Sequence, residues 1–204
     1  MVTVRGHSVA GPRWRIHSTL ARSTANGPGA RFVVWSQGCT LACDGCFNPG
    51  THPVRPGDPA RDPGGRPVAD LVEEVLGTDG IEGVTLTGGE PLEQTEAVAA
   101  FCGAVRRRSD LGIIVLTGFT RAEVEGDARR AAAVADTDLV VAGRYNARLR
   151  LGAGLRGSSN KEYWALTGRY TAADLAEVPE AELVIGTDGS ITLTGMHEWE
   201  GGPR

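Results

Sequence analysis

The stretch that decides the fold is residues 83–118, GVTLTGGEPLEQTEAVAAFCGAVRRRSDLGIIVLTG. Residues 83–87 and 112–117 are short, apolar runs that each lead into a glycine, as expected of buried strands. Residues 92–107 lie between them and have the length and spacing of a helix. A strand, a helix and a second strand in this order form the crossover unit that joins parallel strands.

The same alternation continues on both sides of this unit. Two apolar runs and one loosely alternating stretch predict three more strands, and helical spacing predicts three more helices. The expected strands are residues 13–20, 31–36 and 139–142, and the expected helices are residues 68–76, 120–134 and 173–178. Thr120 and Glu123 have the spacing of a capping box at the start of the second helix. Alternation of this kind predicts an α/β fold with a parallel sheet.

The C-terminal part of the chain carries a hairpin signal. Residues 182–185 and 191–194 are β-rich runs that flank Gly186-Thr187-Asp188-Gly189-Ser190. Asp-Gly between two such runs is typical of a tight turn between antiparallel strands. A C-terminal β-hairpin is therefore expected.

Composition and charge narrow the function classes. The chain has 204 residues, 41% of them hydrophobic, which is typical of a single globular domain, here expected to span residues 1–204. The net charge is −4 and no basic stripe is present, so we expect no nucleic-acid partner. No apolar run is long enough for a membrane span, and the N-terminus has no signal-peptide pattern, so we expect a cytoplasmic protein with no membrane partner.

Several polar or glycine-containing segments follow the expected strands. They are residues 37–66, Gly88-Gly89-Glu90, Thr117-Gly118 and Gly143-Arg144, and residues 145–160 are expected to be a further polar loop. The carboxyl ends of parallel strands meet at one edge of a sheet, where ligands bind. We therefore expect these segments to converge on one site.

Three cysteines occupy the first of these segments with the spacing Cys-x3-Cys-x2-Cys. They are Cys39, Cys43 and Cys46. Thiolates are soft ligands that suit iron–sulfur clusters or zinc. Three of them hold three corners of a four-iron cube and leave one iron open to another ligand. Structural zinc would need a fourth ligand, for which His52 or Cys102 are the candidates, although Cys102 lies in an apolar stretch and is expected to be a buried core residue.

The segment from Gly27 to Pro49 resembles the signature of radical S-adenosylmethionine enzymes that install glycyl radicals. The matching residues are Gly27-Pro28-Gly29-Ala30-Arg31 and Gly38-Cys39-Thr40-Leu41-Ala42-Cys43-Asp44-Gly45-Cys46-Phe47-Asn48-Pro49. Within that family the chain looks most like the activating proteins of anaerobic ribonucleotide reductase. The resemblance extends to Leu86-Thr87-Gly88-Gly89-Glu90-Pro91, to Leu116-Thr117-Gly118-Phe119-Thr120 and to Leu155-Arg156-Gly157-Ser158-Ser159-Asn160. It implies a partial (β/α) barrel of the radical SAM type.

The resemblance also implies a mechanism and partners. A [4Fe–4S] cluster would bind S-adenosylmethionine at its open iron and cleave it reductively to methionine and a 5′-deoxyadenosyl radical. The radical would abstract hydrogen from a glycyl radical enzyme or from another hydrogen-donor substrate. A flavodoxin or ferredoxin would supply the electron.

The resemblance places cofactor-binding residues around this centre. Gly88 and Gly89 would let the backbone approach the ligand closely, and Glu90 would accept a hydrogen bond from its amino group. Phe47 would flank the adenine, although ordinary core packing is an equal alternative. Thr117 would contribute from the loop after the third strand of the family pattern.

The polar block Arg156, Ser158, Ser159 and Asn160 would bind the ribose, the carboxylate or the partner. The alternative is structural: Ser159 or Asn160 could cap a helix that includes Tyr163 and Trp164. Two positions depart from the family pattern, because Ala142 stands where Asp is common and Lys161 stands where Gln is common.

Three functions compete on the sequence alone. The first is an activase that forms a glycyl radical on a partner enzyme. The second is a radical enzyme that acts directly on a small metabolite or a peptide; the chain lacks cysteines after Cys102, where many peptide-modifying relatives carry further clusters. The third is a non-catalytic iron–sulfur or zinc-binding module.

Overall fold

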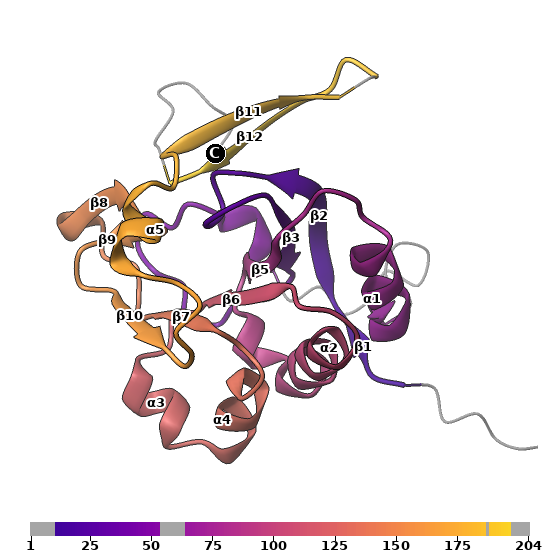
Figure 1. Cartoon of the computed structure of the whole chain (residues 1–204). Coiled ribbons are helices and arrows are strands. Elements are labelled where there is room, and N and C mark those ends of the chain that lie inside the picture. Colours follow the sequence, from indigo (N-terminus) through magenta and orange to yellow (C-terminus); the bar gives the residue numbers. More distant parts are fainter. Residues whose placement is uncertain (1–10, 54–63, 187, 197–204) are drawn as a thin grey trace, which may run out of the picture.

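The computed structural model describes residues 11–53, 64–186 and 188–196. A six-stranded sheet in the order β10-β7-β6-β5-β3-β2 forms its centre (Figure 1). Its strands are β2 (Ile16–Ser23), β3 (Arg31–Ser36), β5 (Gly83–Gly88), β6 (Gly112–Leu116), β7 (Leu139–Ala142) and β10 (Glu162–Ala165). The four inner strands are parallel and the two edge strands are antiparallel to their neighbours. The predicted α/β fold with a parallel sheet is confirmed, and the described strands form an open sheet.

The helices of the described residues are α1 (Val68–Leu76), α2 (Thr95–Arg108), α3 (Arg121–Glu125), α4 (Ala128–Val134) and α5 (Ala172–Ala176). Helices α1 to α4 connect the parallel strands, as the sequence pattern predicts, and α5 follows the edge strand β10. In α1, Val68, Leu71, Val72 and Val75 recur at helical spacing and are all buried, so one stripe of the helix faces the core. The capping box of Thr120 and Glu123 is confirmed at the start of α3.

One expected helix is divided in two. Residues 120–134 were predicted as a single helix, but α3 ends at Glu125, with Gly126 as its C-cap, and α4 begins after Asp127. The Asp127 carboxylate accepts hydrogen bonds from the backbone N–H groups of Arg129 and Arg130 and caps α4. A glycine followed by a capping residue therefore interrupts the helix.

The sheet separates two apolar clusters. Val140 and Ala142 of β7 pack on the helical side with the larger cluster, whereas Leu139 and Val141 face a smaller cluster that includes Leu175 of α5. This alternation follows from the two-residue period of a strand. Because both faces of β7 are covered, its sequence is continuously apolar.

A buried arginine ties the first parallel strands together. Arg31 of β3 has no exposed surface, and all five of its N–H groups donate hydrogen bonds. The acceptors are the Thr85 hydroxyl at 2.7 Å, the Tyr170 hydroxyl at 2.8 Å and the carbonyls of Val84, Gly112 and Pro28 at 2.7, 2.8 and 3.1 Å. A side chain at Gly27 would lie 2.4 Å from the Arg31 Cδ atom, so the glycine makes room for the arginine. The Gly27–Arg31 motif is thus structural.

Short elements complete the fold. They are β1 (Arg13–Trp14) paired with β4 (Arg66–Pro67), β8 (Arg150–Ala153) paired with β9 (Arg156–Ser158), and the 3-10 turns η1 (Pro49–Thr51), η2 (Pro91–Glu93) and η3 (Ala147–Leu149). The expectation of a plain loop over residues 145–160 is wrong, because η3, β8 and β9 lie within it. The alternative helix around Tyr163 and Trp164 is also wrong, because both residues belong to β10 and pair with β7.

None of the helices in the described residues has the length and apolarity of a membrane span.

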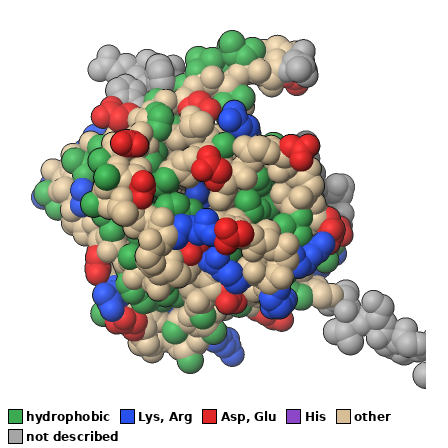
Figure 2. All heavy atoms as spheres, viewed as in Figure 1, with side chains coloured by type: hydrophobic (Ala, Val, Ile, Leu, Met, Phe, Trp, Pro, Cys, Tyr) green, Lys and Arg blue, Asp and Glu red, His purple; other side chains and the backbone are tan. Residues whose placement is uncertain are grey.

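The C-terminal hairpin is confirmed as β11 (Ala181–Ile185) and β12 (Ile191–Gly195). Its polar face docks on the turn between β2 and β3, where the Glu182 carboxylate accepts hydrogen bonds from the Ser23 hydroxyl and the Thr24 backbone. Leu183, Ile185, Ile191 and Leu193 are exposed, and Figure 2 shows hydrophobic side chains along this hairpin at the top of the view. The hairpin is held by hydrogen bonds and leaves apolar side chains in solvent.

Candidate functional site

The carboxyl ends of β3 and β5 are joined through their backbones. The Gly89 N–H donates to the Ser36 carbonyl and the Glu90 N–H donates to the Gly38 carbonyl, both at 2.9 Å. A Cβ atom at Gly89 would lie 2.3 Å from the Gly38 carbonyl oxygen. The glycine therefore lets the loop after β5 pack directly on the start of the segment that carries the three cysteines, residues 37–53, called the cysteine loop below.

Gly88 has a similar structural requirement. Its φ angle of 98° lies in the left-handed region that favours glycine, and a Cβ atom there would lie 2.5 Å from the Ser36 nitrogen. Gly88 thus lies closely against the end of β3, and Gly89 lies closely against the start of the cysteine loop.

Glu90 connects the loops that follow β5 and β6. Its carboxylate is only 1% exposed and accepts hydrogen bonds from the Thr117 hydroxyl at 2.7 Å, the Gly118 N–H at 2.7 Å and the Leu92 N–H at 2.9 Å. Burial raises the pKa of Glu90, and these donors oppose the rise. Both predicted residues, Glu90 and Thr117, are therefore brought together, and they bind each other.

The three predicted ligands Cys39, Cys43 and Cys46 lie on one partly buried loop as free thiols. Two turns shape this loop, because Ala42 and Gly45 both have left-handed backbones and the Cys46 N–H donates to the Cys43 carbonyl at 3.2 Å. Burial raises the pKa values of Cys39 and Cys46. The thiolate is the form that binds a metal, so binding of a metal would release the protons of these thiols.

The cysteine loop is anchored at both ends. The Cys39 N–H donates to the His52 carbonyl at 3.2 Å, and the Thr40 backbone and hydroxyl both donate to the Glu93 carboxylate. A side chain at Gly118 would lie 2.3 Å from Leu41 Cδ1, so this loop also packs on the end of β6. Among the described residues, no three His, Cys, Asp or Glu side chains surround a position for a single metal ion.

Cys102 lies elsewhere, as its apolar surroundings in the sequence predict. It is fully buried on α2 within the large apolar cluster, and burial raises its pKa to about 12. A thiol in this setting is a core residue. The structure thus separates Cys102 from the three cysteines of the loop.

Phe47 is partly buried and contacts Tyr145 and Arg150. Its ring centroid lies 4.6 Å from that of Tyr145, and the Arg150 guanidinium lies 4.8 Å from the centroid of Phe47. A Cβ atom at Gly157 would lie 2.4 Å from the Phe47 ring. Phe47 therefore packs the cysteine loop against the β8–β9 hairpin.

The residues of the predicted polar block have three different environments. Ser158 is buried and its hydroxyl accepts from the Asn146 N–H at 3.2 Å, and the Asn160 side chain donates to the Arg144 carbonyl at 2.9 Å. The Arg156 guanidinium lies 4.6 Å from the centroid of the Tyr163 ring, and its buried Nε makes no hydrogen bond to the described residues. Ser158 and Asn160 therefore hold the segment after β7, and Arg156 packs on β10.

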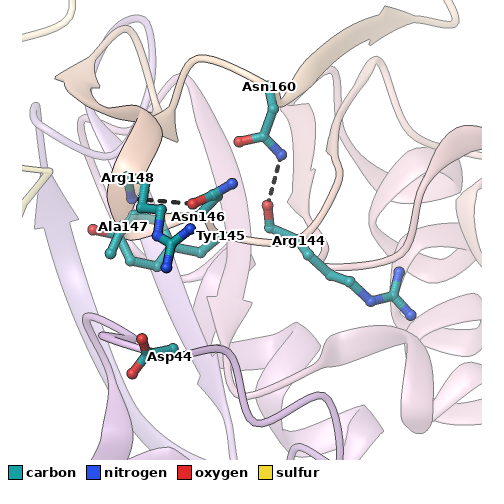
Figure 3. Close-up of a pocket in the computed structure, with 7 residues that line it drawn as sticks. All are labelled: Asp44, Arg144, Tyr145, Asn146, Ala147, Arg148 and Asn160. Atoms are coloured by element: carbon teal, nitrogen blue, oxygen red, sulfur yellow. Dashed lines mark hydrogen bonds between the residues drawn. The ribbon is translucent and has the colours of Figure 1, made fainter.

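A cavity of about 400 Å³ lies between the cysteine loop and the segment after β7 (Figure 3). It is lined by Asp44, Arg144, Tyr145, Asn146, Ala147, Arg148 and Asn160. Of the residues predicted to bind a cofactor, only Asn160 lines it. The other lining residues come from segments that were expected to converge on the site, but no cofactor contact was predicted for them; the cluster of arginine and asparagine directly after an apolar strand is the signal that could have identified them.

Two cations border the strand ends. The Arg144 guanidinium forms an ion pair of 2.5 Å with Glu123 and donates to the Gly118 carbonyl at 3.2 Å. The Lys161 ammonium donates to the carbonyls of Thr117 and Gly143. The ends of the four parallel strands and the start of β10 thus form one connected site, as the sequence pattern predicts.

Comparison with known proteins agrees with this geometry. Residues 25–164 match a family described as a 4Fe-4S single cluster domain. The anaerobic ribonucleoside-triphosphate reductase-activating protein of Enterobacteria phage T4 is 30% identical over 148 residues, which cover 70% of this chain and 88% of that protein.

Two further relatives match a shorter region. The pyruvate formate-lyase-activating enzyme of Listeria monocytogenes is 38% identical over 94 residues, which cover 43% of this chain and 35% of that enzyme. That of Staphylococcus epidermidis is 37% identical over 86 residues, covering 39% and 32%. This chain therefore belongs to the 4Fe-4S single cluster domain family and to the family of activating proteins of glycyl radical enzymes, and it spans about a third of the length of the pyruvate formate-lyase-activating enzymes that it matches.

Proposed function

We propose that this chain holds one [4Fe–4S] cluster on Cys39, Cys43 and Cys46, cleaves S-adenosylmethionine reductively, and thereby activates a glycyl radical enzyme. The observation that carries the proposal is the position of the three free thiols. They lie on a single partly buried loop that is hydrogen-bonded to the carboxyl ends of the parallel strands. This is the edge of a parallel sheet at which ligands bind.

The donor set fits such a cluster. Three thiolates are soft ligands that suit iron–sulfur chemistry, and they occupy three of the four corners. Cys102 is the only other cysteine of the chain and it lies in the core, so the fourth iron keeps an open position. When bound, the cluster supplies the single electron that cleaves S-adenosylmethionine to methionine and a 5′-deoxyadenosyl radical.

The chain's own residues would orient S-adenosylmethionine beside the thiols. The cavity of about 400 Å³ has a suitable size for a small cofactor and lies next to Asp44 of the cysteine loop. Arg144, Arg148 and Asn160 offer donors for a carboxylate or for ribose hydroxyls. We assign Gly88, Gly89, Glu90 and Thr117 to the floor of the site, because they fix the loops on which these side chains stand, and Phe47, Arg156 and Ser158 to its wall.

The fold supports access by a large partner. The six-stranded sheet is open, and we interpret it as the partial (β/α) barrel expected of this family. The T4 relative, matched over most of its length, is named for the activation of anaerobic ribonucleoside-triphosphate reductase. We therefore propose a glycyl radical enzyme of that type as the hydrogen donor, and a flavodoxin or ferredoxin as the electron donor.

Anaerobic reconstitution tests the proposal. We expect about four irons and four sulfides per chain, and release of 5′-deoxyadenosine when S-adenosylmethionine and a reductant are added. Each of Cys39→Ala, Cys43→Ala and Cys46→Ala should lose most of the iron and all nucleoside release. Cys102→Ala is the matched control: it should keep the iron and cost about 1 kcal/mol of stability through the small cavity left in the core.

The partner is tested separately by electron paramagnetic resonance. Addition of an anaerobic ribonucleotide reductase should yield a glycyl radical signal that requires both S-adenosylmethionine and the intact cysteines. Release of 5′-deoxyadenosine without any such signal would instead indicate a small metabolite or a peptide as substrate. Stoichiometric zinc with no nucleoside release would overturn the enzymatic proposal.

A further inference from the structure

Lys161 is the only lysine in the sequence, in which 20 arginines supply the remaining Lys and Arg positive charge. It immediately precedes β10, whose first residue, Glu162, pairs with Ala142 at the carboxyl end of β7. The antiparallel direction of β10 therefore brings Lys161 to the same edge of the sheet as the cysteine loop.

The Lys161 ammonium is held by backbone carbonyls. It donates to the Thr117 carbonyl at 3.1 Å and to the Gly143 carbonyl at 2.5 Å, and so bridges the segments that follow β6 and β7. Its carbon chain also packs near Gly143, where a Cβ atom would lie 3.9 Å from Lys161 Cγ. An ammonium is compact and has three donors, so it fits between two carbonyls where the planar guanidinium of arginine would not.

No carboxylate in the described part of the chain forms an ion pair with Lys161. Arg144 differs, because its charge is matched by Glu123 at 2.5 Å. Carbonyl groups are dipoles and carry no net charge, so they leave the positive charge of Lys161 uncompensated. Lys161 is therefore a half-buried cation with no ion-pair partner among residues 11–53, 64–186 and 188–196.

The acidic groups that face this cation belong to the candidate site. Burial lowers the pKa of Lys161, whereas negative charge on Glu90, Cys43 and Cys46 raises it. Reciprocally, the positive charge of Lys161 lowers the pKa of the Cys46 thiol. Lys161 and the cysteine loop are thus within electrostatic reach of each other.

We propose that Lys161 is a positioning residue whose ammonium fixes the ends of β6 and β7 and supplies the positive charge that favours one-electron reduction of a cluster held by Cys39, Cys43 and Cys46. The inference rests on the proposed function. Reduction transfers one electron from an external donor to the cluster and adds one negative charge there. A cation in a partly buried setting stabilises this added charge, because solvent screens it incompletely.

The test is a redox titration of the reconstituted protein with dithionite, followed by electron paramagnetic resonance. Lys161→Met should keep the iron content but lower the ratio of reduced to oxidised cluster about tenfold at the wild-type midpoint, a shift of about 59 mV for one electron. Lys161→Arg keeps the charge but not the fit between the two carbonyls, so it should recover only part of this shift. Arg107→Met removes an exposed charge on α2 and should leave the midpoint unchanged.

A second measurement uses the single lysine. Incorporation of lysine labelled with ¹⁵N at Nζ gives one side-chain ammonium signal, and its titration reports the pKa of Lys161 directly. Cluster loading should raise this pKa, because the cluster and its thiolates add negative charge. This titration tests the role of Lys161 in the wild-type protein, so it remains informative if Lys161→Met does not bind iron.

The outcomes separate the two proposals. Wild-type protein that takes up no iron would contradict the proposed function. A full cluster with the same midpoint in wild type and Lys161→Met, or a Lys161 pKa that does not respond to cluster loading, would overturn the role of Lys161 and leave the proposed function intact.

Discussion

The Thr117 hydroxyl donates a 2.7 Å hydrogen bond to the Glu90 carboxylate and so links the loop after β6 to the loop after β5. Glu90 also accepts from the Gly118 N–H, and its own N–H donates to the Gly38 carbonyl of the cysteine loop. One buried carboxylate therefore connects three of the segments that build the site. Its role in the structure is to hold these segments in register.

Glu90→Gln should weaken this connection. The amide cannot accept from all of the same donors, so the Thr117 hydroxyl or the Gly118 N–H would lose its partner in a buried position. We expect a loss of about 1–3 kcal/mol in the free energy of unfolding, measured by urea denaturation. Glu177→Gln is the control, because Glu177 is exposed at the end of α5, and equal losses in both variants would contradict the role of Glu90.

Gly89→Ala should disturb the docking of the cysteine loop. The new Cβ atom would lie 2.3 Å from the Gly38 carbonyl oxygen and 3.0 Å from that of Thr51, so backbone must move. We expect a loss of about 1–3 kcal/mol in stability and a lower iron content after reconstitution. Gly168→Ala is the matched control, because open space surrounds that position, and its stability should change little.

Arg31→Met should be among the most damaging single changes. It removes the donors of five hydrogen bonds and leaves the buried carbonyls of Val84 and Gly112 without this partner. Each buried acceptor left without a donor costs about 1–3 kcal/mol, so we expect a total loss of at least about 3 kcal/mol in thermal or urea unfolding. Arg107→Met, on the exposed side of α2, should be nearly neutral.

Glu123 should contribute to the stability of the protein at neutral pH and lose this contribution in acid. The Arg144 guanidinium and the Thr120 N–H hold the pKa of Glu123 at about 2, below the unfolded value of about 4.3. Its contribution is therefore complete above pH 4.3 and is lost as the pH falls towards 2. The contribution of the Arg144–Glu123 ion pair to stability is modest, because the Glu123 side chain is 40% exposed and solvent screens its charge.

Glu123→Gln should flatten the pH dependence of unfolding in this window, with little further change above pH 5. Urea midpoints collected from pH 2.5 to 6 give the comparison. Glu125→Gln serves as the control on the same helix, because Glu125 pairs only with exposed Arg121. A Glu123 variant that keeps the full wild-type slope below pH 4 would contradict the assignment.

The sequence predicted much of the fold because its strongest signals are local. Residues 31–36 and 68–76 coincide with β3 and α1, since continuous apolar runs and helical spacing depend on neighbours along the chain. The Cys39, Cys43 and Cys46 spacing and the Asp-Gly turn of the hairpin are local in the same way. Local patterns of this kind are sufficient to predict these elements and their order.

Other features depended on tertiary contacts. Glu162–Ala165 is too short for its pattern to distinguish a strand from a helix, and it becomes β10 because the edge of β7 offers unpaired backbone groups to it. That pairing brings Lys161 to the carbonyls of Thr117 and Gly143 and places Tyr163 beside Arg156. The sequence by itself therefore determined the cysteine set and the alternating architecture, whereas only the tertiary structure decided which polar side chains surround them, because those neighbours are distant in the chain and are selected by strand pairing.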